Sequence, residues 1–362
     1  MTVYLFLIVT LIMFAPVANI NRRVYLFSSL FVIWIIMSLR GYMVGNDTLT
    51  YVQLYPQIAQ QDLTVGFFKQ MIGGRFEFGF ILLVKFLYFF TPNPRLLIIV
   101  VVTVEILALA YFLENLSCDI PLSLILFVTM NFMGLSMSAM RQCLAMGLGM
   151  VAIVYLLKNY NWQFFLIIFI AGSFHKAAFV LLILYPMYKM TISFKTLALW
   201  LSIFVVAYLT FGTWFSVVTQ QVTSYTNYGM LNNTGDSSSL GIILKIIELV
   251  IIIAFCILAP WPKKTEVRIG VDYGLNTWQF FLLMLGISIG MSFLALKFSQ
   301  ISRISIFFEI VILVLVPRTI SLFKNVSTKF ICSTIVVCSA VLYFYVIQIY
   351  RPEWYGIVPY VF

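Results

Sequence analysis

Long apolar runs separated by short polar or basic stretches dominate the chain. A helix needs about 20 mostly apolar residues to cross a bilayer, so runs of this kind are typical of membrane-spanning segments. The runs lie at 3–18, 24–39, 95–113, 121–138, 140–157, 162–174, 176–188, 196–212, 240–259, 278–297, 303–322 and 331–349. This pattern predicts an all-α, polytopic integral membrane protein with about 12 transmembrane helices.

Basic residues between the runs predict the orientation, because short loops rich in lysine and arginine stay on the cytoplasmic side. They occur at Arg22, Arg23, Lys158, Lys189, Lys195, Lys263, Lys264, Arg268, Arg318, Lys324 and Lys329. The polar segments at about 40–77 and 213–239 and the C-terminal tail then lie on the opposite, extracytoplasmic face. Such loops, with tyrosine, asparagine and glutamine, suit an uncharged polar ligand such as a sugar.

One further apolar run, Phe78–Phe90, does not fit this topology as a span. The chain between Glu77 and Ser138 must cross the membrane an even number of times, yet it contains three apolar runs. Phe78–Phe90 is the shortest, with 13 residues, and we interpret it as re-entrant or interfacial. Cys118 is then expected near the cytoplasmic side.

Composition supports one membrane domain covering 1–362. With 63% hydrophobic and 9% charged residues, the chain cannot cover a water-facing surface. The net charge of +10 comes from short loops and contains no basic run of the kind that binds nucleic acid. Five cysteines without CxxC spacing and a single histidine argue against disulfide or zinc frameworks, and no metal or cofactor is expected. The first 17 residues lack a basic n-region and are read as the first span rather than a signal peptide.

Three cationic residues, Arg141, His175 and Arg303, fall at outer ends of predicted spans. A charge within an apolar stretch such as Leu122–Leu157 is costly and often marks a water-filled functional cavity. Guanidinium groups suit phosphate or pyrophosphate, and a lipid pyrophosphate is the membrane-borne candidate. The alternative is that the arginines snorkel to head groups, above all Arg303. Small residues that follow Arg141 permit close helix packing.

His175 suits a base or a hydrogen-bond donor to phosphate, and a structural histidine is the alternative. The two short spans on either side of it predict a helical hairpin with a polar tip at Phe174–Lys176.

The acidic candidates are Asp47 and Glu77, either of which suits proton acceptance from a hydroxyl or sugar binding. For Asp47 a turn role is the alternative, because it follows Gly45 and Asn46. Glu105 and Glu309 lie inside predicted spans, where we expect hydrogen-bonded or ion-paired structural roles.

Several short motifs resemble, in order and spacing, the EpsG/Wzy-like family of bacterial polysaccharide polymerases. They are Arg40-Gly41, Gly45-Asn46-Asp47-Thr48 with Tyr51 and Tyr55, Glu77-Phe78-Gly79-Phe80, Met140-Arg141-Gln142-Cys143-Leu144-Ala145, Phe174-His175-Lys176-Ala177-Ala178, Arg303 before Phe307-Phe308, Pro317, and Pro359-Tyr360. The resemblance covers nearly the whole chain. Family members often have Gly-Thr-Asp in place of Gly45-Asn46-Asp47, and often Ser or Thr at the step occupied by Ala177-Ala178.

The resemblance implies a membrane glycosyltransferase with a GT-C-like fold in the bacterial inner membrane. Such an enzyme transfers the growing glycan from undecaprenyl pyrophosphate to the non-reducing end of a new lipid-linked repeat unit, on the periplasmic side. The implied partners are these lipid-linked oligosaccharides, membrane lipids, the repeat-unit flippase and a chain-length regulator.

The same resemblance implies roles for individual residues. Arg141 and Arg303 would bind pyrophosphate, and His175 would bind pyrophosphate or transfer a proton. Asp47 or Glu77 would accept the proton of the acceptor hydroxyl. Further substrate contacts are expected from four residues: Gln142, Arg40, Tyr51 and Tyr360.

Three other functions remain open at this point. An O-antigen ligase uses the same donor but transfers the glycan to lipid A core. A repeat-unit flippase belongs to a different class, and such transporters commonly have internal pseudo-symmetry and midplane sites, whereas the charged candidates here gather at one face. A membrane acyltransferase that decorates the glycan is the third.

Overall fold

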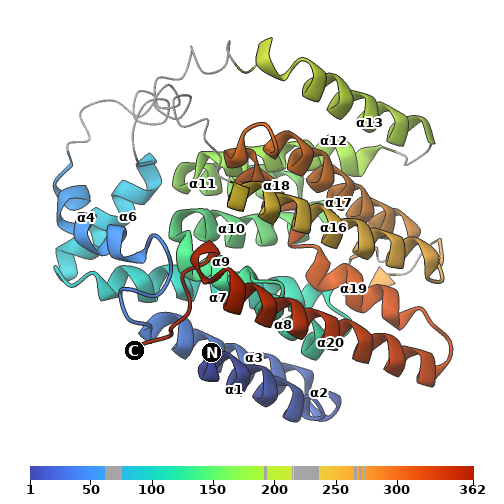
Figure 1. The fold of residues 1–362 in the computed structure, drawn as a ribbon, viewed down its shortest axis with the longest axis horizontal. Coiled ribbons are helices and arrows are strands. Elements are labelled where there is room, and N and C mark those ends of the chain that lie inside the picture. Colours follow the sequence, from blue (N-terminus) through green and yellow to red (C-terminus); the bar gives the residue numbers. More distant parts are fainter. Residues whose placement is uncertain are drawn as a thin grey trace.

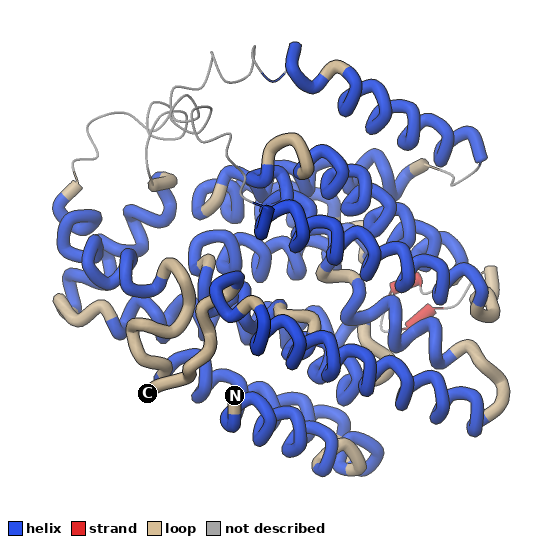
Figure 2. The backbone as a smooth tube through the Cα atoms, viewed as in Figure 1, coloured by secondary structure: helices blue, strands red, loops and turns tan. Residues whose placement is uncertain are grey.

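The computed structural model is built almost entirely of helices that run roughly side by side across the molecule (Figures 1 and 2). It describes residues 1–61, 76–190, 194–213, 215, 236–264, 267–268, 271–272 and 274–362. Large parts of the predicted loops at 40–77 and 213–239 lie outside these residues.

The elements follow one another along the chain with short connections. The helices are α1 (Thr2–Met13), α2 (Val17–Ile20), α3 (Arg22–Leu39), α4 (Thr48–Gln60), α6 (Phe78–Phe90), α7 (Arg95–Leu116), α8 (Ile120–Thr129), α9 (Phe132–Ser138), α10 (Met140–Leu157), α11 (Asn161–Phe174), η1 (Lys176–Ile183), α12 (Leu184–Lys189), α13 (Phe194–Leu209), α16 (Asp236–Leu258), α17 (Leu275–Ala295), η2 (Ser299–Ile301), α18 (Ser302–Glu309), α19 (Ile312–Ser321), α20 (Val326–Tyr350) and η3 (Pro352–Trp354). Strands β1 (Val267–Arg268) and β2 (Val271–Asp272) form a short antiparallel ladder.

The all-helical, polytopic fold class is confirmed. Among the described residues, seven helices are long and apolar enough to cross a membrane, or up to nine if each of two bent pairs is one span. The bent pairs are α8 with α9, at 52°, and α18 with α19, at 44°. Each pair covers one of the predicted spans, and Asn131, in a left-handed conformation, marks the first break. The total of about 12 spans is not established, because several predicted spans form helices too short for the criterion.

Helix α10 forms the centre of the bundle. Of its span, 78% of residues are buried, against 17% for α16 and for α20. It packs against α7 on one side and α11 on the other. A Cβ atom at Gly147 would lie 3.3 Å from the Cα of Glu105 in α7, so this glycine permits the close approach expected of the small residues after Arg141.

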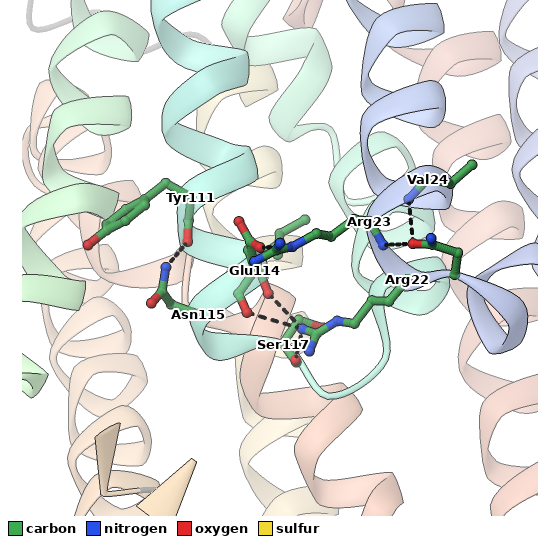
Figure 3. A network of polar contacts seen from close by, with 9 residues as sticks. Arg22, Arg23, Val24, Tyr111, Glu114, Asn115 and Ser117 are labelled. Carbon is green, nitrogen blue, oxygen red and sulfur yellow. Dashed lines mark hydrogen bonds and ion pairs between the residues drawn. The ribbon is translucent and has the colours of Figure 1, made fainter. Parts of the chain in front are cut away.

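At one end of the bundle, arginine side chains bind the end of α7 (Figure 3). The Arg22 Nη2 atom donates hydrogen bonds to the carbonyls of Leu113, Glu114 and Ser117, at 3.1, 3.3 and 2.5 Å. Arg23 pairs with the Glu114 carboxylate at 2.6 Å. The guanidinium groups therefore stabilise the carbonyl end of α7, where the helix dipole is negative.

Two other basic loops lie at the same end. Lys158 donates to the Asn115 side chain at 2.6 Å, and Lys189 donates to the Asn159 side chain at 3.2 Å. We call this end, defined by residues 21–23, 113–118, 158–159 and 189, the basic end. Loops that the charge pattern assigns to one face of the membrane thus meet in space.

The opposite end, which we call the polar end, gathers the connections at 40–47, 91–94, 138–140, 174–176 and 301–303 with the tail 351–362. Two hydrogen bonds illustrate this: Gln142 Nε2 to the Arg303 carbonyl and Tyr360 Oη to the Ile36 carbonyl, both at 2.8 Å. Figure 1 shows α4 and α6 at the same end of the bundle as the C-terminus.

Helix α6 starts and finishes at the polar end. Glu77, just before it, pairs with Arg141 at the start of α10. Just after it, the Thr91 carbonyl accepts a hydrogen bond from Tyr55 at 3.3 Å, and Arg95 donates to the Arg40 carbonyl. This arrangement agrees with the interpretation of Phe78–Phe90 as a segment that does not cross the membrane.

We predict that labelling with a membrane-impermeant maleimide will give Asn93→Cys and Arg303→Cys the same sidedness, because both positions are exposed at the polar end. Native Cys118, beside the Arg22 contact at Ser117, is expected to react only from the other side. Each cysteine is tested alone in a chain otherwise without cysteine. Labelling of positions 93 and 303 from opposite sides would show that α6 crosses the membrane.

Candidate functional site

One buried carboxylate holds two of the predicted site residues at the polar end. A Glu77 carboxylate oxygen forms an ion pair with Arg141, from the first turn of α10. The other lies 3.3 Å from Nδ1 of His175, at the end of α11. The backbone N–H of Lys176 donates to this second oxygen at 3.4 Å. Three sequence motifs therefore meet at one carboxylate.

The electrostatics of this group keep Glu77 ionised. Its side chain is only 6% exposed, and burial alone would raise its pKa. The His175 ring, with Nδ1 at 3.3 Å, and the positive charge of Arg141 outweigh burial and lower the pKa to about 2. Glu77 is therefore a poor proton acceptor near neutral pH. It orients Arg141 and His175 instead.

Aromatic and hydroxyl groups fix the Arg141 guanidinium further. Its Nε donates to the Tyr51 hydroxyl oxygen at 2.9 Å, and the group lies 5.0 Å from the ring centre of Phe76 and 5.9 Å from that of Phe80. Tyr51 comes from α4, so this amphipathic helix closes over the charged group. Cation–π contacts of this kind stabilise a guanidinium that has lost part of its water shell.

Close packing against α11 explains the glycine in the Glu77-Phe78-Gly79 motif. A Cβ atom at Gly79 would lie 2.3 Å from the Ser173 hydroxyl oxygen and 2.9 Å from its carbonyl oxygen. Only a glycine lets the first turn of α6 approach the end of α11 this closely. That approach brings Glu77 within reach of His175.

His175 lies at the tip of a helical hairpin, as predicted. Helix α11 ends at Phe174, and η1 with α12 runs back along it until Lys189 reaches Asn159. The His175 backbone is extended, which redirects the chain between the two arms. Because Nδ1 faces Glu77, Nε2 is the ring nitrogen that this carboxylate does not engage.

Gln142 joins α10 to α18. It is 4% exposed, and its amide donates to the backbone carbonyl of Arg303. The contact ties the first turn of α18 to the residue that follows Arg141. The Arg303 side chain itself is exposed. Gln142 thus acts as a tether, a role that its predicted place among substrate contacts did not indicate.

Asp47 lies at the N-terminus of α4, one helical turn before Tyr51. Their spacing of four residues places both on one face of the helix. The Asp47 carboxylate is half-buried and does not cap the helix. In the described part of the chain no ion pair or side-chain hydrogen bond holds it, in contrast to Glu77.

Arg40 has a different environment. It is completely buried, and it donates to the carbonyls of Met37, Val44 and Met137, the last two at 3.3 and 3.1 Å. Burial lowers its pKa to about 10, so it remains charged at neutral pH. This environment favours a structural role over the substrate contact that the resemblance implies.

Tyr360 also belongs to the structure around Arg40. Its hydroxyl group donates to the Ile36 carbonyl, and its ring packs edge-on against Tyr4, 5.9 Å between centres. These contacts join the tail to α1 and α3, which favours packing over sugar binding.

The expected structural roles of two intramembrane carboxylates are confirmed. Glu105 accepts a hydrogen bond from Ser136. Glu309 accepts from Ser288 and Ser305 at 2.9 and 3.0 Å, and lies 3.3 Å from Lys245. Lys245 and its second partner Glu248, at 3.0 Å, were not among the residues predicted from the sequence. Their spacing of three residues along one predicted span was the available signal.

The described residues contain no group of three or more His, Cys, Asp or Glu side chains able to hold a metal ion. What they bring together is an arginine and a histidine on one carboxylate, with a second carboxylate on the neighbouring helix. The molecule is thus a multi-pass, all-helical membrane protein with a charged cluster at one end. It belongs to the EpsG family, whose model matches residues 23–362. Searches of curated proteins and of solved structures found no match. Family membership indicates a role in polysaccharide polymerisation.

We predict that Glu77→Gln will weaken the acid sensitivity of the fold. Because the pKa of Glu77 is lower in the folded protein, its ionised form stabilises the fold fully at pH values above the ordinary pKa of 4.5. This stabilisation disappears as the pH falls toward 2. The loss is on the order of 2–3 kcal/mol. Thermal unfolding in detergent between pH 7 and pH 3 measures it: the variant should start lower at pH 7 and fall less.

Glu114→Gln is the matched control, because Glu114 is also paired with an arginine but at the basic end. It should retain the wild-type pH dependence. A Glu77→Gln variant with an unchanged pH dependence would contradict the role of Glu77 as the ionised anchor.

Proposed function

We propose that this protein is a membrane glycosyltransferase that polymerises lipid-linked repeat units. The growing glycan leaves undecaprenyl pyrophosphate and is joined to the non-reducing end of a newly arrived unit. The polar end faces the periplasm, the protein resides in the bacterial inner membrane, and the architecture is GT-C-like. Its partners are the repeat-unit flippase and a chain-length regulator.

The proposal rests on the different environments of two carboxylates, Glu77 and Asp47. Glu77 is held by Arg141 and His175, while Asp47 lies half-exposed on the helix that also supplies Tyr51 to Arg141. A glycosyl transfer with a pyrophosphate leaving group needs fixed cations on one side of the reacting carbon and a proton acceptor on the other. The polar end offers both.

The reaction follows from these groups. The hydroxyl oxygen of the acceptor sugar attacks the anomeric carbon of the donor, and the bond from that carbon to the pyrophosphate oxygen breaks. The electron pair of the broken bond leaves with the lipid pyrophosphate. The proton of the attacking hydroxyl passes to the Asp47 carboxylate. The donor glycan becomes linked to the acceptor, and no oxidant or reductant is consumed.

Arg141, His175 and Arg303 act on the leaving group in this scheme. Arg141 provides planar donors to phosphate oxygens, and Nε2 of His175 provides a hydrogen bond. Arg303, tethered through its backbone to Gln142, adds positive charge from α18. Because these groups are already oriented, they stabilise the developing negative charge with little rearrangement. Glu77 supports this orientation without reacting.

We predict that Arg141→Lys will lower the polymerisation rate at least about a hundredfold, because lysine keeps the charge but loses the planar donors. Replacement by lysine avoids leaving buried Glu77 without a cation. The rate is measured on purified protein in liposomes with lipid-linked repeat units, at equal amounts of folded protein.

Arg23→Lys serves as control, since Arg23 also pairs with a glutamate but at the basic end. It should retain the wild-type rate. An Arg141→Lys protein with full activity would remove Arg141 from the reaction.

We predict that deletion of the gene will collapse the surface-glycan ladder to a single repeat unit, and that restoring the gene will rebuild it. Single repeats require synthesis, flipping and attachment to continue, so this pattern assigns the protein to polymerisation. Gel electrophoresis of the surface glycan measures the number of repeat units per chain. Complete loss of surface repeats would favour a flippase or a ligase, and an unchanged ladder that lacks an acyl group would favour an acyltransferase.

A further inference from the structure

The tail 351–362 crosses the polar end and binds the loop that carries Asp47. The Asn46 side-chain amide donates to the carbonyls of Glu353 and Trp354, both at 3.0 Å. The N–H of Gly45 donates to the carbonyl of Gly356 at 2.7 Å. Three hydrogen bonds therefore join the two residues before Asp47 to one turn of the tail.

The loop is also bound from the other side, by the end of α9. Ser138 accepts from the Asn46 N–H at 3.4 Å, and its hydroxyl group donates to the Tyr355 carbonyl. Gly45 has φ +93°, and a Cβ atom there would lie 2.1 Å from the Met137 carbonyl oxygen. The loop thus lies between the end of α9 and the tail, with no room for a larger residue at position 45.

Gly356 is the tightest contact on the tail side. It adopts φ +62°, which favours glycine, and a Cβ atom would lie 2.2 Å from the Asn46 side-chain oxygen. The tail is in turn fixed along its length: Tyr4 donates to the Ile357 carbonyl at 2.9 Å and Gly41 donates to the Val361 carbonyl at 2.7 Å. These contacts hold Gly356 against Asn46.

We propose that Asn46 and Gly356 are positioning residues that set the place of the Asp47 carboxylate. The tail acts as a strap: its carbonyls accept hydrogen bonds from Asn46, and Asn46 holds the next residue, Asp47, in place before α4. The inference rests on the proposed function for its catalytic consequence, but the geometric part concerns position 47 alone. A shift of about 1 Å at a reacting group can lower a rate roughly a hundredfold.

The first experiment is a double-mutant cycle in full-length protein in liposomes, with lipid-linked repeat units as substrate. Gly356→Ala should lower kcat roughly tenfold to a hundredfold with little change in KM, and Asn46→Ala should do the same. In an Asp47→Asn background, neither substitution should lower the rate further. Losses that multiply in the double variants would overturn the proposal, because the strap would then act on something other than Asp47.

Gly286→Ala is the matched control, because a Cβ atom at Gly286 meets nothing within 4 Å. It should leave kcat and KM unchanged. A loss as large as that of Gly356→Ala would overturn the assignment of a specific role to Gly356.

The second experiment needs no enzymatic activity. Asp47→Cys is introduced into a chain whose five native cysteines are replaced, and its reaction rate with a water-soluble maleimide is measured in membranes. Adding Gly356→Ala or Asn46→Ala should change this rate severalfold, whereas Gly286→Ala should not. An unchanged rate overturns the strap whatever the enzyme does. A changed rate in a protein that polymerises nothing would retain the strap and reject the proposed function.

Discussion

Backbone carbonyls at the C-terminal ends of helices need hydrogen-bond donors, and at several helix ends in this protein arginine side chains supply them. Arg22 serves the end of α7, Arg95 the end of α3, and Arg40 both the end of α3 and the end of α9. A buried carbonyl without a donor costs on the order of 1–3 kcal/mol, and neither lipid nor an apolar core offers one. The guanidinium fork reaches several oxygens at once, so one side chain can join segments distant in sequence. The packing of the polar end, and hence the loop of Asp47, depends on Arg40 in this way.

The charged group around Glu77 also depends on an arginine side chain, but here the arginine binds a carboxylate and not backbone carbonyls. The formal charges of Arg141 and Glu77 cancel, so the pair by itself attracts an anion weakly. What the pair provides is orientation: the carboxylate fixes the guanidinium and the imidazole before a substrate arrives. In the proposed mechanism the net positive charge comes from Arg303, whose side chain is exposed on the helix that Gln142 tethers. A fixed cluster and an exposed cation together combine specificity with attraction.

The apolar pattern predicted the helices well, because burial in lipid or protein leaves little freedom in where a long apolar run can go. It also predicted the tip at His175. The number of crossings was harder, since 121–138 and 303–322 break in the middle and short runs such as Asn161–Phe174 lie below spanning length. Rare charge in an apolar chain indicated the place of the charged cluster, as at Arg141, but the sequence did not reveal side chains whose partners are backbone groups. Nothing in the sequence indicates that Arg40 binds carbonyls or that the Asn46 amide donates to the carbonyls of Glu353 and Trp354.

The Gln142 side-chain amide donates a hydrogen bond to the main-chain oxygen of Arg303. This hydrogen bond does not involve the side chain at position 303, so it does not depend on which side chain is there. A substitution at position 303 therefore leaves this contact in place. Glu77, Arg141 and His175 differ in this respect, because each is held through its side chain and a substitution there changes the cluster itself.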